Sequence, residues 1–252
     1  MTIFTCEDDF MSMMTCIYEA WASRRGHANV KLMREPLYEQ ELFHEYVHVD
    51  ADEAKADSVI RSVKEKISVE AYIWVYYAAR SECEDALDTI YRFLVMGFHY
   101  GSRVCYMLQH PIVMRMLEIK RRVGNEAHLF REFLRFSSID NKVYVAHIEP
   151  QSDVLMMVAN HFNDRMMCEH WIIMDDTRNI AAIHPRNSDY YIRYLTDDEA
   201  KELLKTEQYK DEFVAMWKEY FDTIAIRERT NPKCQRNHFP VWMRKHAVEF
   251  AE

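Results

Sequence analysis

The sequence contains only four glycines, and no two of them form a phosphate-binding loop of the GxGxxG or GxxxxGK[ST] type. Such loops need glycine because backbone N–H groups must come close to the phosphate. This absence argues against nucleotide binding of the Rossmann or P-loop kind. It therefore also argues against an ATPase or a nicotinamide-dependent dehydrogenase.

The sequence also lacks the run of ~18 uncharged apolar residues that a membrane-spanning helix requires. Its start, MTIFTCEDDFMSMMTC, has no basic stretch followed by an apolar core. We therefore expect no export and no membrane insertion, and a cytoplasmic location.

Metal-binding and cofactor-binding patterns are missing as well. The six cysteines include no CxxC pair, and the twelve histidines include no HExxH motif. His44 and His48 are four residues apart, but β-forming residues between them favour an extended segment, in which they would not share a helix face. We therefore expect no metal and no cofactor.

What the sequence does contain is the composition of a globular protein, with 49% hydrophobic and 29% charged residues over 252 positions. The apolar spacing predicts an α+β fold that is mainly helical. A small N-terminal β-α-β element is predicted over residues 2–33. Further helices are predicted over 52–67, 69–79 and 84–98, and a long helix from Pro111 to Phe136, with proline suited to its first turn.

In the second half, the pattern predicts a β-α-β-β unit whose last two strands form an antiparallel hairpin. Its elements are a strand over 142–148, a helix over 153–162, and strands over 169–174 and 180–184. A further helix over 197–226 and an irregular tail over 231–250 follow. We expect an N-terminal α+β segment, 1–82, and a helical and β-α-β-β domain with a basic tail, 83–252, unless the two form one continuous domain.

Charge is unevenly placed along this acidic chain, whose net charge is −9. Residues 1–60 carry 5 basic against 12 acidic groups, and residues 137–226 carry 9 against 17. In contrast, residues 111–136 and residues 227–252 each carry 6 basic against 3 acidic groups. These two basic islands are the parts of the sequence most suited to nucleic acid.

One face of the predicted long helix carries a polar stripe, because Arg121, Asn125, His128, Glu132 and Arg135 follow one another at spacings of three and four. The stripe could bind phosphate, or Glu132 could hold His128 for proton transfer. The alternative is a solvated helix face with ordinary ion pairs.

A second group of candidates comes from the β-α-β-β unit. His161 and Arg165 lie near the end of its helix, and Asp175 and Arg178 flank the hairpin turn. They would join the polar stripe in one cleft if the sheet packs on the long helix. Alternatively, His161 interacts with the helix dipole, and Asp175 and Arg178 stabilise the turn locally.

The tail mixes Gln235, Arg236 and Arg244 with the aromatic residues Phe239 and Trp242. Cations that meet phosphates and flat side chains that stack on bases are typical of nucleic-acid contacts. Equally, the aromatic side chains could anchor the tail on the core.

Several stretches of the chain carry a family resemblance. They are WASR (21–24), YRFLVMGF (91–98), RRVGNEAHLFREFLRF (121–136), IEP (148–150), HFNDR (161–165), WIIMDDTR (171–178) and NPKCQRNHFPVWMRKH (231–246). Together they resemble a bacterial family of probable DNA metabolism or repair proteins. Members of that family tend to be encoded beside a radical SAM protein of a putative DNA-modification type, and their C-terminal portion also occurs fused to uracil-DNA-glycosylase-like domains.

The resemblance implies an association with DNA, but the family supplies no catalytic residues that can be carried over to this chain. It includes Asn125, Glu126, His128 and Arg131 in its signature, whereas the end of the tail around Trp242 departs from it. Because the chain lacks the CxxxCxxC iron–sulfur signature, any radical chemistry would belong to the partner.

We therefore expect a DNA-associated accessory protein in DNA repair or modification that acts with a radical SAM enzyme. Two alternatives remain: a stand-alone enzyme that hydrolyses a base or phosphodiester in modified DNA with His128 and Glu132, and an adaptor that does not bind DNA. The residues expected to contact nucleic acid are Arg121, Arg122, Asn125, Arg131, Arg135, His161, Arg165, Asp175, Arg178, Gln235, Arg236 and Arg244.

Overall fold

The computed structural model describes residues 1–37, 42–139, 142–204 and 212–250. Its contacts group the chain into two compact units, Met1–Gly124 and Asn125–Glu252, which we call the N-terminal and C-terminal units. The boundary falls inside helix α5 (Pro111–Phe133). The division at residues 82 and 83 that the sequence suggested stays a prediction.

The sheet of the N-terminal unit has three parallel strands in the order β2-β1-β3. They are β1 (Thr2–Cys6), β2 (Val30–Arg34) and β3 (Glu45–His48). Helix α1 (Phe10–Ala22) connects β1 to β2, which confirms the predicted β-α-β element, and Asp9 caps it by accepting hydrogen bonds from two backbone N–H groups. All five residues of the central strand β1 are buried, as parallel sheets require.

Helices make up the rest of the N-terminal unit. They are η1 (His27–Asn29), α2 (Glu53–Lys66), α3 (Val69–Ala78), α4 (Ala86–Tyr100), η2 (Gly101–Tyr106) and the first part of α5. Asp52 and Ser68 cap α2 and α3 as their side-chain chemistry favours. Gly97 lets α4 pack closely, because a Cβ atom there would lie 2.6 Å from the Ile67 side chain.

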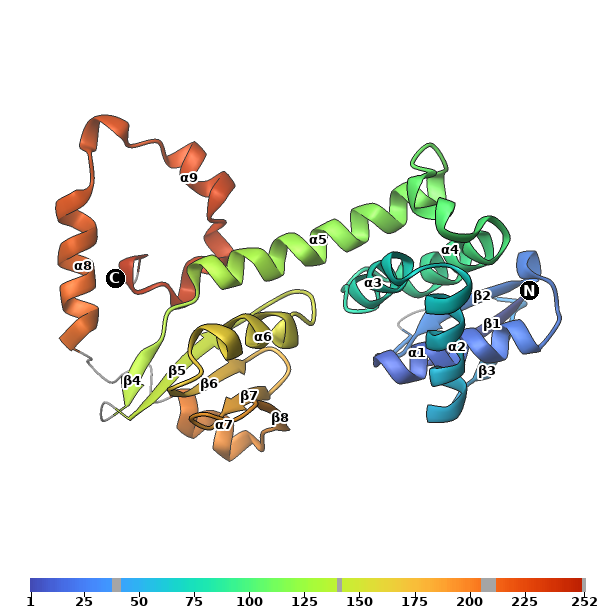
Figure 1. Cartoon of the computed structure of the whole chain (residues 1–252), viewed down its shortest axis with the longest axis horizontal. Coiled ribbons are helices and arrows are strands. Elements are labelled where there is room, and N and C mark those ends of the chain that lie inside the picture. The colour runs from blue at the N-terminus through green and yellow to red at the C-terminus, as the bar shows by residue number, and fades with distance from the viewer. Residues whose placement is uncertain (38–41, 140–141, 205–211, 251–252) are drawn as a thin grey trace. The chain divides into compact units, whose positions relative to one another are not determined.

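The C-terminal unit is built on a five-stranded sheet in the order β4-β5-β6-β7-β8 (Figure 1). Its strands are β4 (Ser137–Ile139), β5 (Val143–Ile148), β6 (His170–Asp175), β7 (Ile180–His184) and β8 (Tyr191–Tyr194). β5 and β6 are parallel and joined through α6 (Leu155–Arg165), and β6 and β7 form an antiparallel hairpin. The predicted β-α-β-β unit is therefore confirmed, and the two edge strands were not predicted.

The chain after the sheet is more helical than expected. It forms α7 (Asp197–Leu204), α8 (Glu212–Ile224), η4 (Arg227–Arg229), α9 (Pro232–His238), η5 (Val241–His246) and η6 (Val248–Phe250). The prediction of an irregular tail was wrong, because both prolines lie where helices begin. Pro232 occupies the first turn of α9, where its missing N–H needs no partner, and Pro240 precedes η5. Part of the predicted helix over 197–226, residues 205–211, lies outside the described residues.

Within the described ranges, none of the helices combines the length and apolarity needed to cross a membrane.

Candidate functional site

Polar residues gather where strands β5 and β6 of the C-terminal unit end. The two strands are parallel, with His147 opposite Met174 and Ile148 opposite Asp175, so their carboxyl ends meet at one edge of the sheet. Glu149 follows β5 and Asp176 follows β6 directly. This edge is where parallel strands commonly place functional side chains.

His147 and Asp176 form a buried pair at this edge. Nδ1 of His147 lies 3.0 Å from Oδ1 of Asp176, and the two side chains are only 4% and 9% exposed. An ionised carboxylate can only accept, so Nδ1 is the donor in this hydrogen bond. Nε2 of His147 is buried with no hydrogen-bond partner among the described residues.

The C-terminal segment brings two more ionisable side chains, His246 and Lys245, close to the pair. The ring of His246 lies against that of His147, with 5.9 Å between the ring centroids. Nε2 of His246 is 3.7 Å from Oε1 of Glu149 and 3.9 Å from Oδ2 of Asp176. Lys245 forms an ion pair with Glu149. We call His147, Glu149, Asp176 and His246 the His–carboxylate cluster.

Aromatic contacts hold this C-terminal segment on the second part of α5. The rings of Phe133 and Phe239 stack with 4.1 Å between centroids, and Phe130 meets Trp242 edge to face. Phe239 is almost fully buried, whereas Trp242 is 42% exposed. For Phe239, the anchoring alternative that the sequence left open is therefore the one observed.

Glu126 fixes α5 to the loop that follows Glu149. Its carboxylate is buried and accepts hydrogen bonds from the backbone N–H groups of Gln151 at 2.6 Å and Ser152 at 3.0 Å. Charge-assisted bonds of this kind are stronger than neutral ones. The sequence marked Glu126 only as part of a family signature, and the structure gives it this positioning role.

The predicted polar stripe of α5 is largely exposed. Nε2 of His128 lies 3.1 Å from Oε1 of Glu132, and both side chains are about half exposed. The predicted pair is therefore present, with the geometry of a surface ion pair one helical turn apart. Arg121 and Asn125, which belong to different units, are exposed as well.

Several of the predicted nucleic-acid-binding cations already interact with other groups of the protein. Arg122 pairs with Glu82, Arg135 with Glu249, and Arg178 with Asp175. Arg131 and Arg244 donate hydrogen bonds to the carbonyls of Ala127 and Phe239. Arg121, Arg165 and Arg236 are exposed and have no carboxylate partner in the part of the chain that the structure describes, and Arg236 donates to the Pro232 carbonyl.

Asp175 stabilises the hairpin turn locally, whereas His161 lies near two arginines. Asp175 is fully buried and accepts hydrogen bonds from the N–H groups of Thr177 and Arg178, which is the turn-stabilising alternative. Burial raises the pKa of Asp175 to about 6, against the opposing effect of Arg178. His161 is partly buried, and its pKa is lowered first by desolvation and then by Arg131 and Arg165. Because Arg131 belongs to α5, His161 lies close to the part of α5 that belongs to the C-terminal unit.

A run of exposed cations lies between α8 and η5. Residues 227–238, which we call the basic arm, are all exposed. The arm carries Arg227, Arg229, Lys233 and Arg236 against a single acid, Glu228. None of the four cations has a carboxylate partner among the described residues. Figure 1 shows the arm running from the end of α8 through α9.

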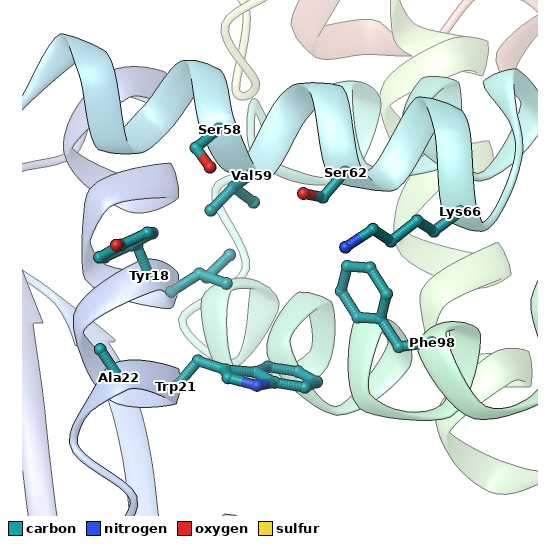
Figure 2. Close-up of a pocket in the computed structure, with 9 residues that line it drawn as sticks. Tyr18, Trp21, Ala22, Ser58, Val59, Ser62, Lys66 and Phe98 are labelled. Atoms are coloured by element: carbon teal, nitrogen blue, oxygen red, sulfur yellow. The ribbon is translucent and has the colours of Figure 1, made fainter.

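The N-terminal unit contains a pocket that was not predicted from the sequence. The pocket of about 410 Å³ lies between α1, α2 and α4 and is lined mainly by apolar side chains, including Tyr18, Trp21 and Phe98. In Figure 2, Lys66 reaches from α2 toward Phe98 and adds a cation to the rim. Its lining residues are scattered over three helices, so no local motif could have marked it.

The comparisons with known proteins bear on the C-terminal part of the chain. No curated protein gives a significant match. The model of the DUF4130 family, a domain of unknown function, matches residues 84–249, which is more than half of the chain. The His–carboxylate cluster and the basic arm lie inside the matched range, whereas Tyr18 and Trp21 of the apolar pocket lie outside it. The chain therefore belongs to the DUF4130 family, a domain of unknown function.

Proposed function

We propose that this chain is a DNA-associated accessory protein in DNA repair or modification, and that it contacts the DNA backbone through the basic arm. The observation that carries the proposal is the set of four exposed cations on residues 227–238 that have no carboxylate partner in the described part of the chain. They stand out in a protein whose net charge is −9.

Unpaired cations suit phosphate binding better than paired ones. A cation that binds DNA releases condensed counterions, which supplies much of the affinity. A cation that already pairs with a carboxylate must first give up that pair, as Arg122 would with Glu82. We therefore propose the arm rather than the predicted helix stripe as the contact, and we retain Arg236 and Gln235 from the predicted residues.

Trp242 adds an aromatic side chain to the proposed DNA contact. It follows the arm closely in sequence and leaves 42% of its side chain exposed, while its contact with Phe130 fixes the ring. A partly exposed, immobilised indole can stack on an unpaired base. The predicted cation Arg244, in contrast, holds the Phe239 carbonyl and serves the fold of the tail.

The proposed partner is a separate radical SAM enzyme. Its support is the family resemblance, together with the absence of a CxxxCxxC signature from this chain. The acidic remainder of the chain would limit non-specific DNA binding or face the partner.

The test compares DNA binding by two charge-matched variants of the full chain. Variant one replaces the arm cations, R227Q/R229Q/K233Q/R236Q. Variant two is the control, R25Q/R115Q/R122Q/R193Q, which removes the same charge from four arginines that each pair with a carboxylate. Fluorescence anisotropy with a labelled duplex and a labelled single strand should show at least tenfold weaker binding for the arm variant only.

Equal losses in both variants would mean that bulk charge controls binding, and would contradict the arm as the contact. No binding by the native protein, together with co-purification of a partner polypeptide, would instead favour the adaptor alternative. A native pull-down analysed for both polypeptides and nucleic acid separates these outcomes.

A second candidate function is hydrolysis of a base or phosphodiester in modified DNA by this protein alone. The sequence suggested His128 and Glu132 for this role, and the buried His147–Asp176 pair now favours a different location. A carboxylate that holds one imidazole nitrogen leaves the other to accept a proton. Turnover by the purified protein that is lost in His147→Ala and kept in His128→Ala would support this candidate. Turnover that is lost in His128→Ala and kept in His147→Ala would instead assign the proton transfer to His128.

A further inference from the structure

Three side chains of the His–carboxylate cluster converge from separate parts of the C-terminal unit. Glu149 follows β5, Asp176 follows β6, and His246 ends η5, about 70 residues further along the chain. One ligand-type atom of each lies within 4.8 Å of the other two, and no other group of this kind is found within the described ranges. These three residues come together only when the tail is folded, so no local sequence motif could predict the group.

The distances within the group fit shared ligation better than hydrogen bonding. His246 Nε2 lies 3.7 Å from Glu149 Oε1 and 3.9 Å from Asp176 Oδ2, which exceeds hydrogen-bond length. Two ligands of one divalent ion, each at about 2.0–2.2 Å, are separated by about 3.0–3.5 Å. The two observed separations lie just above this range, and the Glu149 side chain is one-third exposed.

The surroundings resemble the outer shell of a metal site. His147 holds Asp176 through its Nδ1 atom at 3.0 Å, as outer-shell groups hold ligating carboxylates. The His147 side chain is more than nine-tenths buried, its ring lies against that of His246, and its Nε2 has no partner among the described residues. His147 thus adds a buried imidazole that contacts two of the three members of the group, Asp176 and His246.

We propose that Glu149, Asp176 and His246 bind one divalent transition-metal ion. One imidazole nitrogen with two carboxylate oxygens suits Mn²⁺, Fe²⁺ or Zn²⁺ better than Mg²⁺ or Ca²⁺, which prefer oxygen ligands alone. Three protein ligands leave coordination positions open for water or a phosphate oxygen, as in catalytic rather than structural sites. The site is independent of the basic arm, so its failure would leave the proposed DNA contact untouched.

Removal of Lys245 should raise the metal affinity rather than lower it. It pairs with Glu149 Oε1, the same oxygen that would bind the metal, and its side chain is 62% exposed. The ammonium group therefore competes with the ion for this oxygen and can swing into solvent when the ion binds. Since exposed pairs of this kind contribute little, Lys245→Met should raise metal affinity by about two- to fivefold.

The experiment is calorimetric titration of the purified full chain with MnCl₂ and with ZnCl₂. We expect one site per chain, and an affinity at least tenfold lower in Glu149→Gln and in His246→Ala. The matched control is H128A/E132Q, which removes an exposed histidine–carboxylate pair outside the cluster and should leave the affinity unchanged. Thermal melts of the metal-free variants show whether each is folded.

A second measurement does not depend on the variants. Pulsed electron paramagnetic resonance of the Mn²⁺-loaded native protein should show coupling to an imidazole nitrogen. No saturable binding of either ion, no nitrogen coupling, or equal affinities in the native protein and Glu149→Gln would overturn the proposal.

Discussion

Arg135 of α5 and Glu249 of the C-terminal segment form an ion pair with 2.6 Å between Nη2 and Oε1, although they are 114 positions apart in sequence. The Glu249 side chain is only 3% exposed, so the pair is largely shielded from water. The arginine also lies over the ring of Trp217. This contact holds the tail in the position that brings His246 to the end of β5.

Removing this pair should loosen the tail. Arg135→Gln leaves the buried Glu249 carboxylate without its cation, and we expect the free energy of unfolding to fall by roughly 2–3 kcal/mol. Arg121→Gln, at an exposed position with no carboxylate partner among the described residues, should change it by less than about 0.5 kcal/mol. Urea denaturation measures both, and equal effects would show that the pair does not hold the tail.

The buried carboxyl of Asp175 predicts a pH dependence of stability. Burial raises its pKa from 3.8 to about 6, so the folded chain binds more protons than the unfolded chain between these two values. The stabilisation from Asp175 is therefore fully present below about pH 4 and is lost as the pH rises through about 6. Asp175→Asn cannot titrate and serves as the reference.

We expect the stability advantage of the native protein over Asp175→Asn to shrink by up to about 3 kcal/mol between pH 4 and pH 7. Chemical denaturation at a series of pH values gives this difference directly. An advantage that grows with pH would show instead that Arg178 and the turn N–H groups dominate and favour the charged carboxylate.

Much of the fold could be predicted because its signals are local. The predicted β-α-β element, the helices after Asp52 and Ser68, and the hairpin across residues 175–180 all depend on caps, periodicity and turn residues within a few positions. The edge strands β4 and β8 are only three and four residues long, too short for a clear alternation. The helical tail could not be predicted because proline is compatible both with a break in structure and with the start of a helix, and here Pro232 and Pro240 stand at helix starts.

The candidate site could be predicted only in part. The sequence pointed to α5, to Asp175 and to the tail, and the structure does bring the C-terminal part of α5, the strand ends and the tail into one unit. It could not show that His147 pairs with Asp176 or that His246 reaches them, since these contacts depend on strand register and tail docking. The His128–Glu132 pair of the helix stripe, in contrast, could be predicted because it depends only on i,i+4 spacing.

Two exposed cysteines allow a direct footprint of the proposed DNA contact. Cys234 lies in the basic arm and Cys168 lies between α6 and β6, whereas Cys6, Cys16 and Cys105 are buried. Burial raises the pKa of the Cys105 thiol to about 11, which further suppresses its reaction. Alkylation followed by mass spectrometry should show that DNA slows modification of Cys234 and leaves that of Cys168 unchanged. An arm-specific contact would be contradicted if DNA slowed the alkylation of both cysteines equally or of neither.

The central claim is that the four arm cations neutralise DNA phosphates, and the salt dependence of binding tests it most directly. The slope of log Kobs against log salt concentration falls in magnitude by about 0.7–0.9 for each phosphate contact that is removed. We predict that R227Q/R229Q/K233Q/R236Q lowers the slope by about 2–4, and that the charge-matched control R25Q/R115Q/R122Q/R193Q leaves it unchanged. The same slope for the native protein and the arm variant would contradict the claim.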